Sequence, residues 1–188
     1  QIDAVEFLCK KYEITIPKEV ARPQTPEAEK NKDIYLTLHL EIALWCAEEL
    51  KKNQPARHYL SSRNISQEII NHFQIGFFPS SVDAKRILIK RLQEKSILQK
   101  DLVEFGVFPN LNAKQDALVS PFEDRIIFPI LDTLGRVVGF GGRIFLQGDE
   151  RPKYYNSKES ILFSKKKILF GLHQARKLAA QTKTLFLV

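Results

Sequence analysis

Basic and aromatic side chains alternate in the last third of the chain, and together they could bind a polyanion. The basic residues there are Arg143, Arg151, Lys153, Lys158, Lys165, Lys166 and Lys167, and the aromatic residues among them include Tyr154, Tyr155 and Phe163. Arginine and lysine neutralise phosphates, and aromatic rings stack on the bases of single-stranded nucleic acids. For each lysine taken alone, a position on a solvated face is the simpler interpretation. For Tyr154 and Tyr155, packing in the core is the simpler interpretation.

A glycine cluster, GFGGR at residues 139–143, comes just before this segment. Dinucleotide-binding loops place such glycines between a strand and a helix, and a Walker loop ends in Gly-Lys-Ser/Thr. Neither pattern fits, because the next residues, RIFLQ at 143–147, are strand-like. We therefore expect the glycines between two strands, where they permit a bulge or the close approach of another backbone. Arg143 would begin the second strand and provide the binding.

Positive charge is concentrated in the same part of the chain. Residues 120–188 hold 12 Lys and Arg against 6 Asp and Glu, whereas residues 1–119 hold 17 against 16. A basic surface of this kind suits a nucleic acid or a nucleotide phosphate, although solubility alone would also explain it. No apolar run approaches the roughly 20 residues that cross a bilayer, so no membrane partner is expected.

Metal-ligating residues are few and separated. Cys9 and Cys46 stand alone, without a second cysteine or a histidine at ligand spacing. We expect two reduced thiols in the core. The histidines are expected to be structural or surface groups: His39, His58, His72 and His173. The sequence predicts no metal site within this chain.

The first two thirds of the sequence favour helices. Apolar spacing and capping signals predict helices over residues 4–12, 27–52, 55–63, 67–73, 81–93 and 97–105. Three prolines make residues 16–26 an extended connector, and residues 74–78 are a candidate strand. In the long helix, Ile34, Leu38, Ile42 and Trp45 recur at helical spacing and are expected in the core.

After Ser120 the pattern changes to that of strands. Strands are predicted over residues 125–131, 136–140 and 143–147, followed by the segment KYYNS at 153–157, a helix over 172–181 and a last strand at 184–188. Pro129 within the first of these strands indicates a sheet edge or a bulge. The predicted fold is α+β, with a mostly helical first part leading into a small antiparallel sheet that has a basic face.

Several long stretches of this sequence match one family in order and spacing: YLSSRNISQEIINHFQIGFFP (59–79), RIIFPILDTLGRVVGFGGR (125–143), RPKYYNS (151–157) and ILFSKKKILFGLHQAR (161–176). They resemble the N-terminal subdomain of the RNA polymerase core of bacterial-type DNA primase. The resemblance covers essentially the whole chain. It implies that residues 1–26 are a connector with a short helix, which follows a zinc-binding domain. Residues 27–183 are implied to be the core subdomain (helical 27–119, sheet-rich and basic 120–183), and residues 184–188 the first strand of a TOPRIM subdomain.

The resemblance implies a fragment of a DNA-directed RNA polymerase, which synthesises short RNA primers on single-stranded DNA. In the family, this subdomain lines one side of a basic groove, and the acidic TOPRIM subdomain opposite binds two Mg²⁺ or Mn²⁺ ions. Implied partners are template DNA, the RNA–DNA hybrid, ribonucleoside triphosphates and, through a further C-terminal region, the replicative helicase. The implied location is the cytoplasmic replication fork of a bacterium.

The resemblance also implies that this chain holds no catalytic residue. The strand-like run LFLV ends at Val188, and in the family the general-base glutamate follows such a strand at once. The catalytic acidic residues are therefore expected after Val188. The Mg²⁺ or Mn²⁺ ions that they bind, and the Zn²⁺ of the zinc-binding domain, are expected outside residues 1–188, so this chain alone should be inactive.

Residue by residue, the family's basic and polar groove set matches six positions: Arg63, Arg125, Arg143, Lys153, Asn156 and Lys165. The resemblance implies contacts with template or nucleotide phosphate for the basic members, and Asn156 as their polar partner. Many members carry a further arginine two residues before the position of Arg125, and this chain has Glu123 there. The sequence therefore does not decide whether the groove is positively charged beside Glu123.

Three other interpretations stay open from the residues themselves. A single-stranded nucleic-acid-binding module without catalysis would use the same basic residues. A small-molecule phosphate enzyme would use Arg143 and Lys153, but it needs an acid–base pair, and Asp149 and Glu150 lie in a predicted loop. A structural subdomain would merely turn its basic face towards an acidic neighbour.

Overall fold

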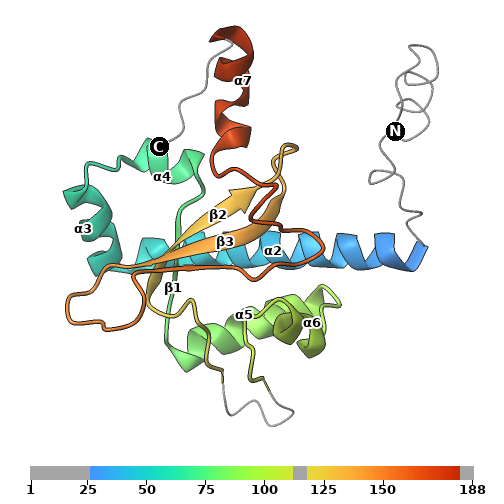
Figure 1. Ribbon diagram of the computed structural model, residues 1–188. Coiled ribbons are helices and arrows are strands. Elements are labelled where there is room, and N and C mark those ends of the chain that lie inside the picture. Colours follow the sequence, from blue (N-terminus) through green and yellow to red (C-terminus); the bar gives the residue numbers. More distant parts are fainter. Residues whose placement is uncertain (1–25, 112–117, 183–188) are drawn as a thin grey trace. The chain divides into compact units, whose positions relative to one another are not determined.

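The computed structural model describes residues 26–111 and 118–182, with side chains except for 26–31 and 177–180. The chain divides into two units, 1–31 and 32–188, and the fold given below is that of the second. The elements in chain order are α2 (Pro26–Lys52), α3 (Gln54–Ser62), α4 (Gln67–His72), β1 (Gly76–Phe78), α5 (Val82–Glu94), α6 (Gln99–Glu104), β2 (Arg125–Leu131), β3 (Val137–Ile144), β4 (Tyr154–Asn156) and α7 (Leu172–Thr182). Figure 1 shows them in sequence colours.

The strands form one antiparallel sheet in the order β1-β2-β3-β4. Residues directly opposite one another in such a sheet point to the same face. Arg143 of β3 lies opposite Ile126 on one side and Tyr154 on the other. We call the face that carries Arg143 the outer face, and its members are Phe77, Ile126, Phe128, Ile130, Gly139, Gly141, Arg143, Tyr154 and Asn156.

The opposite, inner face packs against α2 to form the main core. Leu38, Ile42 and Trp45 are buried there, as their helical spacing predicts, together with side chains of α5, α6 and the sheet. The approach of β1 to α2 requires a glycine, because a Cβ on Gly76 would lie 2.5 Å from the Cβ of Cys46. In Figure 1, α2 runs behind the strands and α5 lies near one end of the sheet.

Most predicted elements are confirmed to within a few residues. Ser66 and Ser81 cap α4 and α5 through their side-chain oxygens. Pro129 lies beyond the end of β1, so that side of β2 is locally an edge, and the register shifts between Ile130 and Leu131. Cys46 is buried and reduced as predicted.

Some predictions fall on parts of the chain that the structure does not describe. The expected helix at 4–12, the connector at 16–25 and Cys9 lie outside the described residues, as does the expected strand at 184–188. Val188, after which the catalytic acidic residues are expected, belongs to that last segment. The first strand of a TOPRIM subdomain and the acidic residues beyond Val188 therefore stay predictions.

The prediction of a break at the glycine cluster is wrong. Residues 136–140 and 143–147 do not form two strands, because the single strand β3 runs through all the glycines and ends at Ile144. Gly141 and Gly142 pair with β2 on one side and with β4 on the other. These two hydrogen-bonded ladders hold the backbone extended and override the low strand propensity of glycine. None of the described helices is long and apolar enough to cross a membrane.

His39, expected to be structural, is a buried neutral group of the core. Its ring lies 5.0 Å from that of Phe105 and 5.5 Å from that of Phe140, and Nδ1 donates to the Tyr35 carbonyl oxygen at 2.7 Å. Burial is the main cause that lowers the pKa of His39 to about 4, against the partial opposing effect of the bond to Tyr35.

We predict that the free energy of unfolding falls between pH 6.5 and pH 4. In this range an unfolded chain binds a proton on His39 that the folded chain does not, so acid favours unfolding by up to roughly 3 kcal/mol. Urea denaturation across this pH range measures the effect. His39→Phe, which cannot titrate, should lose this share of the pH dependence. An equal slope in both proteins would contradict the assignment.

Candidate nucleic-acid interface

Three basic side chains and two tyrosine rings alternate in a row that joins the end of α3 to Arg143 and Tyr154 on the outer face of the sheet. The Cζ atom of Arg63 lies 5.4 Å from the centre of the Tyr59 ring, and that of Arg143 lies 5.7 Å from the same ring. Arg143 also lies 5.4 Å from the ring of Tyr154, which in turn has the Nζ atom of Lys153 at 5.9 Å. These are cation–π distances. We call this set the cation–tyrosine row: Arg63, Tyr59, Arg143, Tyr154 and Lys153.

Helix α3 supplies one end of the row. The side chain of Asn53 caps the helix by accepting from the Ala56 amide at 2.8 Å, and a proline occupies its first turn. Ala56 and Leu60 bury one face of α3 in a small core with Phe77 and Ile126. Tyr59 and Arg63 are four residues apart and therefore neighbours on the helix surface, with Arg63 as the C-cap.

Arg143 is the centre of the row and has no acidic partner among the residues that the structure describes. Its side chain is half-buried, and its Nε atom is buried without a hydrogen-bond acceptor. Among the ion pairs of the described residues, none involves Arg143, Arg63 or Lys153. The guanidinium lies between the rings of Tyr59 and Tyr154, and its charge is not neutralised by a described carboxylate. A guanidinium in this state can bind an anion through two parallel hydrogen bonds.

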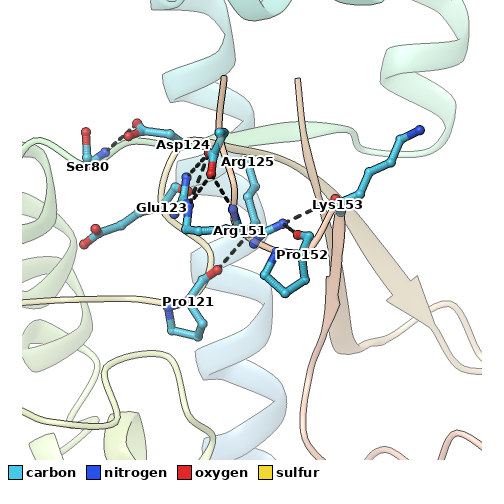
Figure 2. A network of polar contacts seen from close by, with 9 residues as sticks. Ser80, Pro121, Glu123, Asp124, Arg125, Arg151, Pro152 and Lys153 are labelled. Atoms are coloured by element: carbon cyan, nitrogen blue, oxygen red, sulfur yellow. Dashed lines mark hydrogen bonds and ion pairs between the residues drawn. The ribbon is translucent and has the colours of Figure 1, made fainter. Parts of the chain in front are cut away.

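Arg125, in contrast, turns into the protein. Its Nε donates to the Pro121 carbonyl oxygen at 2.9 Å, and one terminal nitrogen donates to the carbonyl oxygens of Pro152 at 2.8 Å and Lys153 at 3.4 Å. The Lys153 carbonyl also accepts from the Ile144 amide at 3.0 Å. Figure 2 shows the contacts of Arg125 with Pro121, Pro152 and Lys153, with the amino group of Lys153 directed away from them. The backbone of Lys153 is thus fixed and its side chain projects outward.

Neighbouring groups complete this network. Burial, and next the charge of Arg151, lower the pKa of Arg125. Arg151 binds the carboxylate of Asp149 at 2.6 Å and donates to the Glu123 carbonyl oxygen at 3.0 Å, and its hydrogen bond lowers the pKa of Asp149 to about 2. Gly142 makes room for the guanidinium stem, because a Cβ there would lie 2.9 Å from Cδ of Arg125. We infer that Arg125, which the sequence suggested as a direct contact, positions Lys153 instead.

The carboxylate of Glu123 has partners within the fold. It accepts from the ammonium of Lys85, a buried residue of α5, and from the Ser120 amide at 3.0 Å. The residue that departs from the family's basic pattern therefore neutralises a buried lysine. Its negative charge is compensated locally, which limits its effect on the cation–tyrosine row.

Asn156 and Lys165 meet at a pocket beside the row. The pocket has a volume of about 310 Å³, and Tyr154, Asn156 and Lys165 are among its lining residues. Asn156 projects from β4 on the outer face, opposite Gly141. Tyr154 belongs to both the pocket and the row. The structure thus brings Arg63, Arg143 and Lys153 together, places Asn156 and Lys165 next to them, and separates Arg125 from both groups.

Two tyrosines were interpreted incompletely from the sequence. Tyr154 is 59% exposed, so its expected core role is wrong, whereas Tyr155 packs into the core with its ring 5.0 Å from that of Phe122. The strand alternation separates these neighbours onto opposite faces. Tyr59 was missed. Its spacing of four residues from Arg63 on a predicted helix is the signal that could have indicated it.

Acid–base and metal chemistry have little support in the described part of the chain. No group of three or more His, Cys, Asp or Glu there could hold a metal ion. Asp149, which a phosphate enzyme would need as an acid or base beside Lys153, forms an ion pair with Arg151. What the described residues offer at this surface is positive charge and aromatic rings.

Comparison with known proteins decides the family. A family model described as "DNA primase catalytic core, N-terminal domain" matches residues 45–176. The chain belongs to this primase family. A DNA primase of Haemophilus influenzae is 36% identical over 191 residues, which cover 100% of this chain and 31% of the primase. One of Pasteurella multocida is 35% identical over 178 residues, covering 93% of this chain and 29% of the primase. The chain thus spans less than a third of these primases.

Solved primase structures have the same fold. A DnaG primase catalytic domain bound to single-stranded DNA superposes with a TM-score of 0.69 at 32% identity, covering 81% of this chain and 47% of that one. The RNA polymerase domain of Mycobacterium tuberculosis primase, in complex with double-stranded DNA that has a 6-nucleotide overhang, gives 0.68 at 29% identity, covering 80% and 46%. The zinc-binding and RNA polymerase domains of Aquifex aeolicus primase give 0.67 at 31% identity, covering 96% and 41%.

Substitution of Tyr59 tests the row. Tyr59→Leu should weaken the binding of a single-stranded oligodeoxynucleotide by about threefold to tenfold, because two cations lose the ring face that holds them. Tyr59→Phe keeps the ring and should bind like the parent. Fluorescence anisotropy titrations at fixed salt give both affinities. Equal losses in the two variants would mean that the hydroxyl, and not the ring, matters.

Proposed function

We propose that this chain forms the basic side of the template and nucleotide groove of a DNA primase. The observation that carries the proposal is the cation–tyrosine row, in which three positive charges, without acidic partners among the described residues, alternate with the half-buried ring of Tyr59 and the exposed ring of Tyr154. Phosphates of a single strand or a triphosphate match the charges, and bases match the rings. The membership of the primase family supports the same polyanions as partners.

The residues of this chain would act by holding substrates and not by exchanging protons. Arg143 can bind a phosphate through two hydrogen bonds, whereas Lys153 and Lys165 act as single point charges. Arg63 extends the positive surface at the end of α3. Together they would hold a triphosphate and the template in line and neutralise charge that grows in the transition state of phosphoryl transfer.

The metal ions of the reaction are proposed to lie elsewhere. Primer synthesis as inferred from the family uses Mg²⁺ or Mn²⁺ on the acidic residues of a TOPRIM subdomain, which are expected after Val188, and Zn²⁺ on a separate domain. The described residues of this chain offer no ligand group for any of them. The helicase contact and the location at the bacterial replication fork are likewise proposals that rest on the family alone.

A second candidate is a single-stranded nucleic-acid-binding module without catalysis. The row itself favours it equally, since charge and stacking bind a strand without any metal. This candidate predicts salt-sensitive DNA binding with no response to nucleotides. The family membership ranks it below the primase proposal.

Primer synthesis by the full-length protein separates the two candidates. On single-stranded DNA with Mg²⁺ or Mn²⁺, we expect short template-dependent RNA from labelled ribonucleotides. Lys153→Ala and Lys165→Ala should each lower the rate on the order of 10²-fold if these contacts act in the transition state. Lys90→Ala, which removes an exposed lysine from α5, is the matched control and should keep the parental rate.

The contrary outcomes are equally specific. Parental rates in both site variants would remove these lysines from the groove. Primer synthesis by residues 1–188 alone would overturn the proposal that the metals lie outside this chain. Salt-sensitive DNA binding by the full-length protein without any synthesis would favour the binding module.

A further inference from the structure

A second hollow in the surface lies between α2, α3 and α4, and we call it the α2–α4 cleft. Its volume is about 220 Å³, and the aliphatic side chains of Leu44, Leu50, Ile70 and Ile75 line it. Leu44 is 45% exposed, and Leu40, one turn earlier on the same side of α2, is 46% exposed. An apolar cavity of roughly 150 Å³ holds a benzene-sized group, so the cleft accommodates one large apolar side chain.

The charged side chains at the α2–α4 cleft are all basic among the residues that the structure describes. Lys51 and Arg57 line it, both exposed, and none of the described lining residues is acidic. No ion pair of the described residues includes Lys51 or Arg57. The two glutamates that precede Lys51 in α2 have other partners, in the ion pairs Glu48–Arg91 at 3.0 Å and Glu49–Lys52 at 2.6 Å. Two positive charges at the cleft are thus without a described counter-ion.

The position of Arg57 is unfavourable for the helix that carries it. Arg57 lies in the first turn of α3, at the end where the helix dipole disfavours a cation. Lys51, in contrast, lies in the last turn of α2, where a cation stabilises a helix. Helix stability therefore accounts for Lys51 but not for Arg57, whose charge suits an anion in the cleft.

The α2–α4 cleft is separate from the cation–tyrosine row. A helix turns about 100° per residue, so Arg57 and Tyr59 are roughly 200° apart around the axis of α3. The buried residues Ala56 and Leu60 lie between them on that helix. Arg57 therefore serves the cleft, whereas Tyr59 and Arg63 serve the row.

The lining of the cleft favours a peptide over a nucleic acid. No described lining residue is aromatic, so the cleft lacks the ring faces on which bases stack. Aliphatic walls next to two cations suit an apolar side chain with carboxylates beside it. Amide side chains also line the cleft and offer donors and acceptors to a peptide backbone: Gln67, Asn71 and Gln74.

We propose that the α2–α4 cleft docks a segment of a partner protein in which one large apolar side chain is flanked by acidic residues. The apolar side chain enters between Leu44 and Ile70, and the carboxylates pair with Lys51 and Arg57. The chain's net charge of +7 favours the approach of an acidic partner. This inference goes beyond the proposed function and does not depend on it, because the cleft and the row share no residue.

Selection of peptides by the full-length protein tests the docking. A library of random short peptides displayed on phage is the probe, and we expect the selected sequences to combine Asp or Glu with Leu, Ile or Phe. Fluorescence anisotropy of the labelled synthetic peptides then gives their affinities. Arg57→Glu should weaken binding at least about tenfold, because it sets like charges against each other. Leu44→Gln should weaken binding about threefold to tenfold, because it removes apolar contact.

Matched substitutions on α5 separate the cleft from general effects of charge and surface polarity. Lys90→Glu reverses an exposed positive charge as Arg57→Glu does, and Ile87→Gln replaces a 63% exposed apolar residue as Leu44→Gln does. Both should bind the peptides like the parent, and so should Arg143→Ala, which alters the row. A single-stranded oligodeoxynucleotide should bind equally to Arg57→Glu and Lys90→Glu. Circular dichroism confirms that each variant is folded.

Four results would overturn the docking and leave the proposed function standing. Three of them are the selection of no peptide, the selection of peptides without acidic residues, and equal peptide affinities of Arg57→Glu and Lys90→Glu. The fourth is a loss of peptide binding in Arg143→Ala with none in Arg57→Glu, which would place the peptides on the row.

The oligodeoxynucleotide decides the remaining cases. A fall in its affinity with Arg57→Glu and Leu44→Gln, but not with their α5 controls, would make the cleft a nucleic-acid surface and overturn the docking. A parent that does not bind the oligodeoxynucleotide, but binds the selected peptides through the cleft, would refute the proposed function and support the docking.

Discussion

The guanidinium of Arg125, bound to backbone carbonyl oxygens inside the fold, is the interaction on which the rest of the site depends. A buried cation is costly unless its hydrogen bonds are made, and three carbonyls with Arg125 as their donor meet that requirement. These carbonyls belong to two segments far apart in sequence, residues 121 and 152–153. The contact therefore fixes the chain as it enters β4, and with it the direction of Lys153.

The cation–tyrosine row follows from that fixed strand and from the register of the sheet. Arg143 lies opposite Tyr154, so the two side chains share the outer face, and α3 places Tyr59 on the other side of the guanidinium. Like charges repel, and the interleaved ring faces offset part of that repulsion by presenting negative electrostatic potential to each cation. The row is thus a preformed positive surface, and under the proposed function this would lower the ordering cost of binding a strand.

The sequence predicted the helices well and the polar contacts less well. Apolar spacing identifies α2 because buried apolar residues recur along one side of the helix. The serine caps mark the starts of α4 and α5. The glycines of β3 misled the prediction, since propensity describes a strand alone and not one paired on both sides. Residue type also could not show that Arg125 binds carbonyls and that Arg143 has no acidic partner among the described residues, because both depend on segments that meet only in the folded chain. For the tyrosines, strand alternation separates Tyr154 from Tyr155, but it does not say which face is covered.

The central claim is that Arg125 acts on nucleic acid through Lys153 and does not touch it. A double-mutant cycle tests this claim, with the affinity for a single-stranded oligodeoxynucleotide measured for the parent, Arg125→Met, Lys153→Ala and the double variant, each verified as folded. If the claim holds, Arg125→Met weakens binding in the parent and has no further effect in the Lys153→Ala background. Losses that add in free energy would show that Arg125 contacts the nucleic acid itself, and would contradict the account.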